Sequence, residues 1–313
     1  MKAEKSRMGT RKNAGAGKPP LIDRTDSLVF TYQTLVCLIV LVGNVPGPKW
    51  AYWVGHVIFS AFLLLLFLWD RNIHHPLVRF LRGNYPLVFI TFFYMEAGLL
   101  VHAFFPGTLD PLLWEVDRFL LGGGPALWAI QQETIPPRWV TEFFHLGYSF
   151  FYFLMPIAAL ALWFKGTRER HSTFMFSLIL TYFIPYLLFI LLPAHSPRLF
   201  DPALREPLPG YLWSDLLRST LKEVAYPGGS FPSSHVAASV ICFMAWKSLG
   251  KWRYPVLFMT LVMFAGTVYG RYHYVVDTLT GLMAGLVLYR VAPWVRSHWP
   301  GPTLAAARST TRR

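Results

Sequence analysis

The chain alternates between apolar blocks of roughly twenty residues and shorter segments that carry most of its charges. A helix of about twenty apolar residues spans the ~30 Å hydrocarbon layer of a bilayer, and it satisfies its backbone hydrogen bonds within its own segment. The pattern therefore predicts an all-α, polytopic membrane bundle of about eight transmembrane helices. The predicted spans cover residues 28–43, 50–69, 86–105, 142–163, 173–193, 234–249, 254–270 and 275–293.

Composition narrows the class of protein further. Of the 313 residues, 54% are hydrophobic and only 14% are charged, whereas soluble domains carry roughly 25% charged residues. A soluble globule, a coiled coil and a largely disordered chain are thereby excluded. Cys37 and Cys242 are the only cysteines, and both lie in apolar blocks. A secreted disulfide scaffold and a metal–thiolate site are therefore excluded as well.

The basic residues are divided unevenly between the two sides of the predicted bundle. With eight spans, 21 of the 29 Lys and Arg residues fall on the side of the termini and 8 on the other side. Basic residues in short loops favour the cytoplasm. Both termini are therefore predicted to be cytoplasmic, and the long loops 106–141 and 194–233 extracytoplasmic. The net charge of +13 is read as an orientation signal, and no nucleic-acid partner is expected.

The candidate chemistry lies in three polar segments that are distant in sequence but share the predicted outer face. Residues 193–198 end the fifth predicted span, residues 231–235 begin the sixth, and residues 270–277 join the seventh to the eighth. Because all three reach the same side of the membrane, we expect their side chains to form one extracytoplasmic site.

Two histidines in these segments have the surroundings of catalytic groups. His273 and Asp277 are four residues apart, so on a helix they lie on one face. The carboxylate can hold one imidazole N–H and leave the other nitrogen free to attack. His235 follows Ser233 and Ser234, which are typical helix caps, and a helix start with free N–H groups favours an anion.

Two arginines complete the pattern. Arg198 and Arg271 carry planar guanidinium groups that suit phosphate oxygens. Together the residues indicate phosphoryl transfer in which one histidine attacks phosphorus and the other protonates the leaving oxygen. No acidic or histidine cluster with ligand spacing surrounds the motifs, so neither a metal nor another cofactor is predicted. The alternative for each residue is structural: a capping histidine, a helix-start aspartate, or an arginine that snorkels to the interface.

These motifs resemble the type-2 phosphatidic acid phosphatase superfamily. Pro-Ser-Ser-His at 232–235 is followed 38 residues later by a His-x-x-x-Asp with a nearby arginine, in the style of that superfamily's second and third motifs. Pro-Arg at 197–198 occupies the place of its first motif. The closer likeness is to the branch of inositol-phosphorylceramide synthases, which shares the Phe-Pro-Ser-x-His and Arg-x-His-Tyr-x-x-Asp styles.

The resemblance implies a division of the chain and a role for each matching residue. It covers residues 86–293, a six-helix catalytic core, preceded by two additional helices in 28–85. A disordered basic arm (1–27) and a basic tail (294–313) are expected in the cytoplasm. His273 would be the nucleophile that forms a phosphohistidine, Asp277 its orienting group and His235 the general acid. Phosphate oxygens would be held by Arg198, Arg271, Ser233 and Ser234.

The sequence departs from the family pattern at three positions. Leu191 stands where the first motif has a lysine, Thr267 stands where the third motif has an arginine, and Ser234 replaces a glycine. Arg271, two residues before His273, is the candidate substitute for the missing arginine.

Other polar residues are candidates for a head-group pocket, with a structural role as the alternative for each. His145 and Tyr148 lie near the outer start of the fourth predicted span, His195 lies beside Arg198, and Glu96 lies inside the third span. Intramembrane ionisable residues usually face the bundle interior. We therefore list His145, Tyr148, His195 and Glu96 as possible pocket residues.

The predicted function is a metal-independent lipid phosphotransferase. A phosphoryl-head group would pass from a phospholipid donor to His273 and then to a lipid or alcohol acceptor within the bilayer. A lipid phosphate phosphatase, in which water is the acceptor, uses the same residues and stays open. A lipid-phosphate transporter or flippase is the second alternative, although it would not need an oriented His/Asp pair. Oligomeric state is not predicted.

Overall fold

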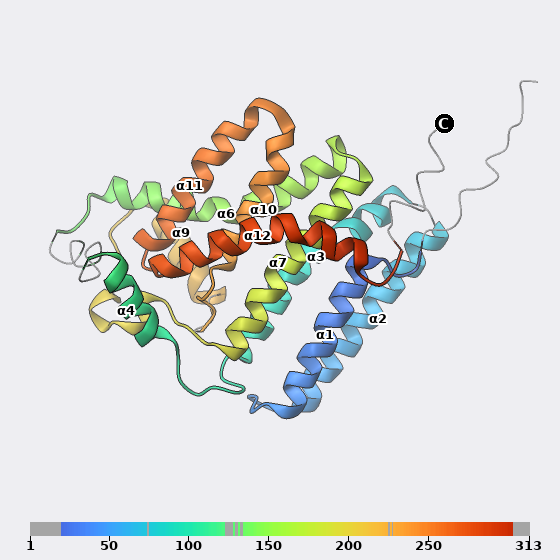
Figure 1. The fold of residues 1–313 in the computed structure, drawn as a ribbon, viewed down its shortest axis with the longest axis horizontal. Coiled ribbons are helices and arrows are strands. Elements are labelled where there is room, and N and C mark those ends of the chain that lie inside the picture. Colours follow the sequence, from blue (N-terminus) through green and yellow to red (C-terminus); the bar gives the residue numbers. More distant parts are fainter. Residues whose placement is uncertain are drawn as a thin grey trace, which may run out of the picture.

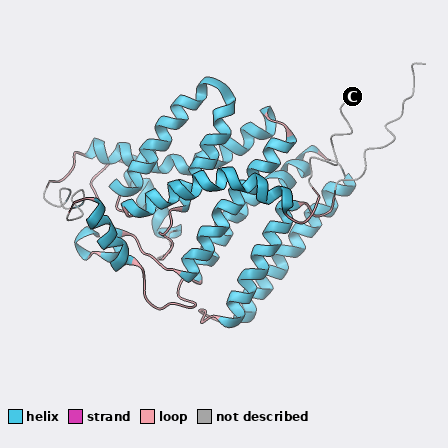
Figure 2. Ribbon diagram, in the orientation of Figure 1, coloured by secondary structure: helices cyan, strands magenta, loops and turns pink. Residues whose placement is uncertain are grey.

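The computed structural model describes residues 20–73, 75–122, 128, 131, 134–224, 226 and 228–302. Over these residues the fold is all-helical, and Figure 2 shows helices joined by loops. Two short 3₁₀ helices, η1 (Pro202–Leu204) and η2 (Lys247–Trp252), accompany eleven α-helices among the described residues. The α-helices are α1 (Arg24–Val42), α2 (Lys49–Ile73), α3 (Pro76–Leu99), α4 (Asp110–Leu120), α6 (Arg138–Lys165), α7 (Arg168–Leu191), α8 (Pro197–Phe200), α9 (Leu212–Val224), α10 (Ser234–Trp246), α11 (Arg253–Tyr269) and α12 (Val275–His298).

The expected all-helical class is confirmed, but the count of eight spans is not supported. Each predicted apolar segment overlaps a helix, although 86–105 extends beyond the end of α3 at Leu99. Only α1, α2, α6, α7 and α12 are long and apolar enough to be candidate spans among the described residues. The other three differ for identifiable reasons. Helix α10 has 13 residues and α11 has 17, while the 24 residues of α3 include two arginines and Glu96.

Helix α7 is the centre of the bundle. It contacts α1, α3, α6, α10 and α12, and 78% of its most apolar stretch is buried. Its apolar residues surround the whole helix, as expected for a helix that packs on every side. Figure 1 shows α1 and α2 side by side along one flank of the bundle, away from α4.

The pair α10 and α12 is held unusually close by two glycines. A Cβ atom at Gly281 would lie 2.5 Å from the carbonyl oxygen of Ser233, and one at Gly285 would lie 2.8 Å from that of Ala237. Only a residue without a side chain allows this approach. Since α10 and α12 begin with the two candidate histidine motifs, the glycines bring those motifs together.

The first helix is fixed to the rest by polar contacts. A buried ion pair joins Asp26 of α1 to Arg82 of α3, and the Tyr85 hydroxyl donates to the same carboxylate at 2.8 Å. Further along, His56 Nε2 of α2 lies 2.9 Å from Glu96 Oε1 of α3. Helices α1 and α2 thus dock on α3 through polar side chains as well as apolar packing.

Both ends of the chain carry more helix than expected. Helix α1 begins at Arg24 and α12 continues to His298, within the segments predicted as an arm and a tail. The two meet, because the Arg24 amide donates to the Pro302 carbonyl at 3.2 Å and Arg24 Nε donates to the Gly301 carbonyl at 2.8 Å. The remainder of the predicted arm and tail, residues 1–19 and 303–313, lies outside the described residues.

Candidate active site

The first polar segment is joined by backbone hydrogen bonds to the residues that directly precede the second. Ala194 and Gly229 form an isolated parallel bridge, in which the Ala194 amide donates to the Gly228 carbonyl at 3.2 Å and the Ser230 amide donates to the Ala194 carbonyl at 3.0 Å. Gly228 has φ = +99°, a conformation that favours glycine. The loop after α7 is therefore fixed against the loop before α10.

The third segment is bound to both of the others. The Arg198 amide donates to the Arg271 carbonyl at 3.4 Å, and the Ser233 amide donates to the Asp277 carbonyl at 3.2 Å. The expected convergence of the three segments is thus what the fold shows.

A tight turn between α11 and α12 points His273 into the site. Arg271 has φ = +62°, in the left-handed region that non-glycine residues rarely adopt. The amides of Tyr272 and His273 then both donate to the Thr267 carbonyl, at 3.0 and 3.1 Å. Thr267, which stands in place of the arginine in the third motif that the sequence resembles, closes the turn with its backbone.

His273 is buried, with 3% of its surface exposed, and its two ring nitrogens face different partners. Nδ1 lies 3.5 Å from Asp277 Oδ2 and 3.3 Å from Ser230 Oγ. The Ser230 hydroxyl donates to the same Asp277 oxygen at 2.5 Å. Nε2 lies 3.4 Å from Ser233 Oγ. Asp277 and Ser230 thus hold one side of the ring, which leaves Nε2 as the candidate attacking atom.

His235, the second residue of α10, lies next to His273. The ring centroids are 5.6 Å apart, and the His235 ring packs against Phe151 at 4.4 Å. Its Nδ1 atom is buried and has no hydrogen-bond partner among the described residues. A buried polar atom without a partner is rare in folded proteins, so this nitrogen is available to a ligand.

The two candidate arginines have different surroundings. The Arg198 guanidinium lies over the Tyr272 ring, 4.7 Å from its centroid, and its buried Nε has no partner within the described part of the chain. Arg271 instead donates to Gln131 Oε1 and to the carbonyl groups of Leu204 and Glu206, at 3.0–3.2 Å. Arg198 therefore faces the site, whereas Arg271 holds its surrounding loops.

A cavity of about 490 Å³ opens beside these groups. Arg198, Ser234, His235 and His273 line one part of it. The rest extends between α3, α6 and α7, and its lining there is mostly apolar and aromatic, including Ile90, Phe151, Met155, Tyr182 and Tyr186. Its size falls within the 300–1,000 Å³ typical of ligand pockets.

The four head-group candidates are placed differently. Tyr148 lines the cavity. His145 is not among the lining residues but contacts one of them: its Nε2 lies 3.4 Å from the hydroxyl of Tyr272. Its Nδ1 lies 2.8 Å from Ser214 Oγ. His195 pairs with Asp110, its Nδ1 3.5 Å from Oδ2. Glu96 pairs with His56 and is not among the lining residues.

Three contributors to the site were missed from the sequence. Ser230 contacts both members of the His/Asp pair, and Tyr272 supports Arg198. Asp117 of α4 caps α12, accepting from the amides of Val275 and Val276 at 2.7 and 2.8 Å. Ser230 directly precedes the second polar segment and Tyr272 lies inside the third, so their positions could have identified them. Asp117 carries no such signal.

Electrostatics at the turn follow from burial. Burial raises the pKa of Tyr272 to about 12, so its hydroxyl stays protonated at neutral pH. Burial also raises the pKa of Asp117, although the hydrogen bonds that its carboxylate accepts from two α12 amides lower this pKa in part. Among the described residues, no group of three or more His, Cys, Asp or Glu side chains could hold a metal ion.

Comparison with known proteins identifies the family. The PAP2 superfamily matches residues 112–291, which include all three polar segments. A PA-phosphatase related-family protein of Dictyostelium discoideum is 26% identical over 312 residues, covering 84% of this chain and 54% of the relative. The chain thus spans about half the length of that relative. No solved structure matches. The chain is a multi-pass integral membrane protein that belongs to the PAP2 superfamily.

Proposed function

We propose that this protein is a lipid phosphotransferase that works through a phosphohistidine. The observation that carries the proposal is the arrangement of His273: Asp277 and Ser230 hold its Nδ1 side, and the residue lines a cavity together with His235 and Arg198. An oriented imidazole beside an unpartnered second imidazole suits nucleophilic catalysis with general acid help.

In the first half of the reaction, Nε2 of His273 forms a bond to the phosphorus of a phospholipid. The bond from phosphorus to the lipid oxygen breaks, and protonated His235 gives its proton to that oxygen. Asp277 stabilises the positive charge that develops on the His273 ring. Arg198, the Ser233 and Ser234 hydroxyls and the free amides at the start of α10 bind the phosphate oxygens.

In the second half, neutral His235 takes the proton of an acceptor hydroxyl. The acceptor oxygen bonds to phosphorus, the bond to Nε2 breaks, and His273 returns to its starting state. Every group in the cycle belongs to this chain, and the proposal includes no metal ion or cofactor.

The shape of the cavity supports a lipid substrate. Its lining residues on α3 and α7, such as Ile90 and Tyr182, lie near the middle of those helices, at the depth of the hydrocarbon layer. An apolar cavity that continues from the histidines to this depth fits an alkyl chain attached to the transferred phosphate. A soluble phosphate ester would leave that arm unfilled.

A lipid phosphate phosphatase is the main alternative, because water can replace the acceptor alcohol. We favour a transferase because the cavity offers 490 Å³, more room than a transferred phosphate needs. The motif styles favour an acceptor of the sphingolipid type, as in the inositol-phosphorylceramide synthase branch. The donor would then be a phospholipid with a polar alcohol head group.

We further propose an orientation in which both termini are cytoplasmic and the histidines are extracytoplasmic, supported by the uneven division of Lys and Arg. Eight helices would cross the membrane, with α3, α10 and α11 spanning by virtue of their packing. Cysteines introduced in 106–122 or 199–219 should react with an impermeant reagent in intact cells. Reaction only after the membrane is opened would reverse the orientation.

The deciding experiment uses the purified full chain in mixed micelles with labelled phospholipid donors, with and without hydroxylated acceptor lipids. A transferase yields a new phospholipid, and a phosphatase yields free phosphate or phosphoalcohol regardless of acceptor. Both products must disappear in His273→Ala. If neither product forms with any donor, while a labelled lipid crosses the membrane of proteoliposomes, the chain is a transporter and the proposal is wrong. EDTA should not reduce turnover.

A further inference from the structure

A second pocket lies at the end of the bundle away from the histidines. It is lined by the start of α1, the first half of α3, the end of α6 and the start of α7. The histidines, in contrast, are near the start of α6 and the end of α7. Helix α7 has 24 residues and is therefore about 36 Å long, so the pocket and the histidines lie at opposite ends of the bundle.

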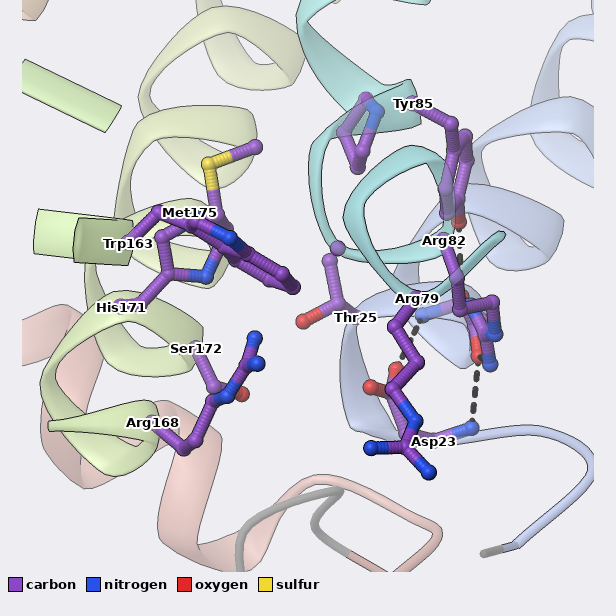
Figure 3. A pocket seen from close by; sticks show the side chains of 13 residues that line it. Asp23, Thr25, Arg79, Arg82, Tyr85, Trp163, Arg168, His171, Ser172 and Met175 are labelled. Atoms are coloured by element: carbon purple, nitrogen blue, oxygen red, sulfur yellow. Dashed lines mark hydrogen bonds and ion pairs between the residues drawn. The ribbon is translucent and has the colours of Figure 1, made fainter. Parts of the chain in front are cut away.

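The side chains of this pocket are mainly cationic and hydrogen-bonding. Figure 3 shows Arg168, His171 and Ser172 on one side and Thr25 and Arg79 on the other. The third arginine of the lining, Arg82, is bound by Asp26, so that pair adds no net charge. Arg79 and Arg168 also line the pocket, together with a second carboxylate, that of Asp23.

Two observations indicate that the arginines serve a ligand. The Nε atom of Arg79 is buried and has no hydrogen-bond partner among the described residues, although it borders an open pocket. The Arg168 guanidinium lies over the Trp163 ring, 3.7 Å from its centroid, which fixes its plane beside the same pocket. Planar guanidinium groups on facing walls match the oxygens of a phosphate group.

Asp23 would oppose an anion, but it is already engaged. Its carboxylate accepts from the Asp26 amide at 2.9 Å as the cap of α1. Burial, reinforced by neighbouring Asp26, raises the pKa of Asp23 to about 7. About half of its negative charge is therefore absent at pH 7, which lessens its repulsion of an anion in the pocket.

We propose that this pocket binds the phosphate group of an anionic lipid in the leaflet opposite to the histidines. The pocket occupies an end of the helix bundle, where lipid phosphates lie, and it is open to its surroundings. Its volume of about 40 Å³ suits the phosphate oxygens but not a whole head group and its chains, which would remain in the bilayer. The proposal does not depend on turnover at His273.

The test measures lipid binding in a background that cannot use the first site, Arg198→Ala with His273→Ala. The full chain is placed in phosphatidylcholine nanodiscs with or without phosphatidic acid, and thermal unfolding and lipids retained in native mass spectrometry are recorded. Phosphatidic acid should raise the midpoint of unfolding. Arg79→Ala and Arg168→Ala should each weaken its binding about tenfold or more, as expected for loss of a charged hydrogen bond.

The matched control is Arg253→Ala, because Arg253 also lies over an aromatic ring, that of Tyr254 at 4.7 Å, but does not line the pocket. It should bind phosphatidic acid normally. If either alanine variant does not fold, Arg79→Lys and Arg168→Lys keep the charge and should still weaken binding. Equal binding by the pocket variants and the control would overturn the proposal.

A titration with inorganic phosphate in neutral detergent separates the two possible sources of the anion. Inorganic phosphate that competes only weakly with phosphatidic acid, with the same dependence on Arg79 and Arg168, supports a lipid ligand whose chains contribute. Phosphate that binds with this dependence while phosphatidic acid does not bind would overturn the lipid assignment and identify a site for a soluble anion.

Discussion

Two buried polar clusters at opposite ends of the bundle use similar residues in different ways. The histidine cluster (Arg198, Ser230, His235, His273 and Asp277) leaves three buried atoms without partners among the described residues: Arg198 Nε, His235 Nδ1 and Asp277 Oδ1.

In the aspartate–arginine cluster (Leu21, Asp26, Arg82 and Tyr85), by contrast, no buried side-chain N or O atom lacks a hydrogen-bond partner. Arg82 donates to both oxygens of Asp26 and to the Leu21 carbonyl, and the Tyr85 hydroxyl donates to Asp26 as well. A cluster whose donors and acceptors are all paired holds helices together. A cluster with unpaired atoms beside a cavity has capacity for a ligand, although each unpaired atom costs stability. Changes to the histidine cluster should therefore affect turnover, and changes to the aspartate–arginine cluster should affect folding.

The largest effect is expected for His273→Ala. Loss of the nucleophile should lower turnover by on the order of 10⁴-fold or more and abolish the phosphoenzyme trapped by acid quench, while the midpoint of unfolding changes little. His235→Ala should lose about 10²–10⁴-fold and recover part of it with a substrate that has an activated leaving group. A phosphohistidine trapped in His273→Ala, or rescue of that variant by the activated substrate, would exchange the two roles.

The second effect is on folding. Arg82→Ala leaves the Asp26 carboxylate buried without its cation, and breaking a buried pair in this way costs about 3–5 kcal/mol. The unfolding midpoint in detergent should fall steeply, while turnover per folded molecule is retained. Arg118→Ala is the control, because Arg118 and Glu115 form an exposed pair at 3.5 Å and such pairs contribute about 0–1 kcal/mol. Lost turnover without lost stability in Arg82→Ala would refute the contrast between the clusters.

The sequence was informative where the determinants are local. Apolar blocks predict helices, and the i, i+4 spacing of His273 and Asp277 predicts that the two side chains meet. They do meet, with Nδ1 3.5 Å from Oδ2, but the expectation that both lie on one helix is wrong, because His273 lies in the turn before α12 begins at Val275. The contacts that depend on distant parts of the chain could not be derived in the same way. Arg271 looks like a phosphate ligand by its position, but its partners lie 65–140 residues away.

Contacts between distant parts of the chain also explain why the partner of Glu96 and the number of membrane spans could not be predicted. Glu96 could face a pocket or a helix, and only the docking of α2 on α3 selects His56 as its partner. Hydropathy alone also cannot show that charged residues of α3 are paired inside the bundle, as Arg82 is with Asp26. The charged residues lower the mean hydropathy of α3, although the fold pairs Arg82 with an opposite charge.

The third effect tests how the histidine cluster is assembled. Gly281→Ala places a Cβ atom 2.5 Å from the Ser233 carbonyl, which forces α10 away from α12 and separates His235 from His273. A displacement of about 1 Å at reacting groups can cost about 10²-fold in kcat. Gly55→Ala on α2 is the matched control, since a Cβ atom there meets nothing within 4 Å. Equal kcat in the two variants would show that close packing of α10 on α12 is not needed.

The smallest effect concerns pH and Asp23, at the edge of the aspartate–arginine cluster. Its pKa is raised from 3.8 to about 7 by burial and by Asp26, against the lowering effect of Arg82. The folded chain thus holds a proton between about pH 4 and pH 7 that the unfolded chain has released. The stability gained from this proton is full below about pH 4 and is lost as the pH rises through 7. Asp23→Asn should remove this component of the pH dependence, because the amide still caps α1 but does not titrate.

Several charged or titratable groups face Asp23 in the pocket, namely Asp26 on α1, Arg79 and Arg82 on α3, and Arg168 and His171 on α7. A second variant, Asp23→Ser, therefore distinguishes the titration of the Asp23 carboxylate from that of its neighbours, since serine also caps a helix but carries no charge. Unfolding midpoints between pH 5 and 8, the window that brackets a pKa of about 7, should vary less in both variants than in the natural chain. If the variants keep the full dependence, another of these groups carries it. In that case the pKa of Asp23 lies outside this window, and its titration does not set the charge of the pocket near neutral pH.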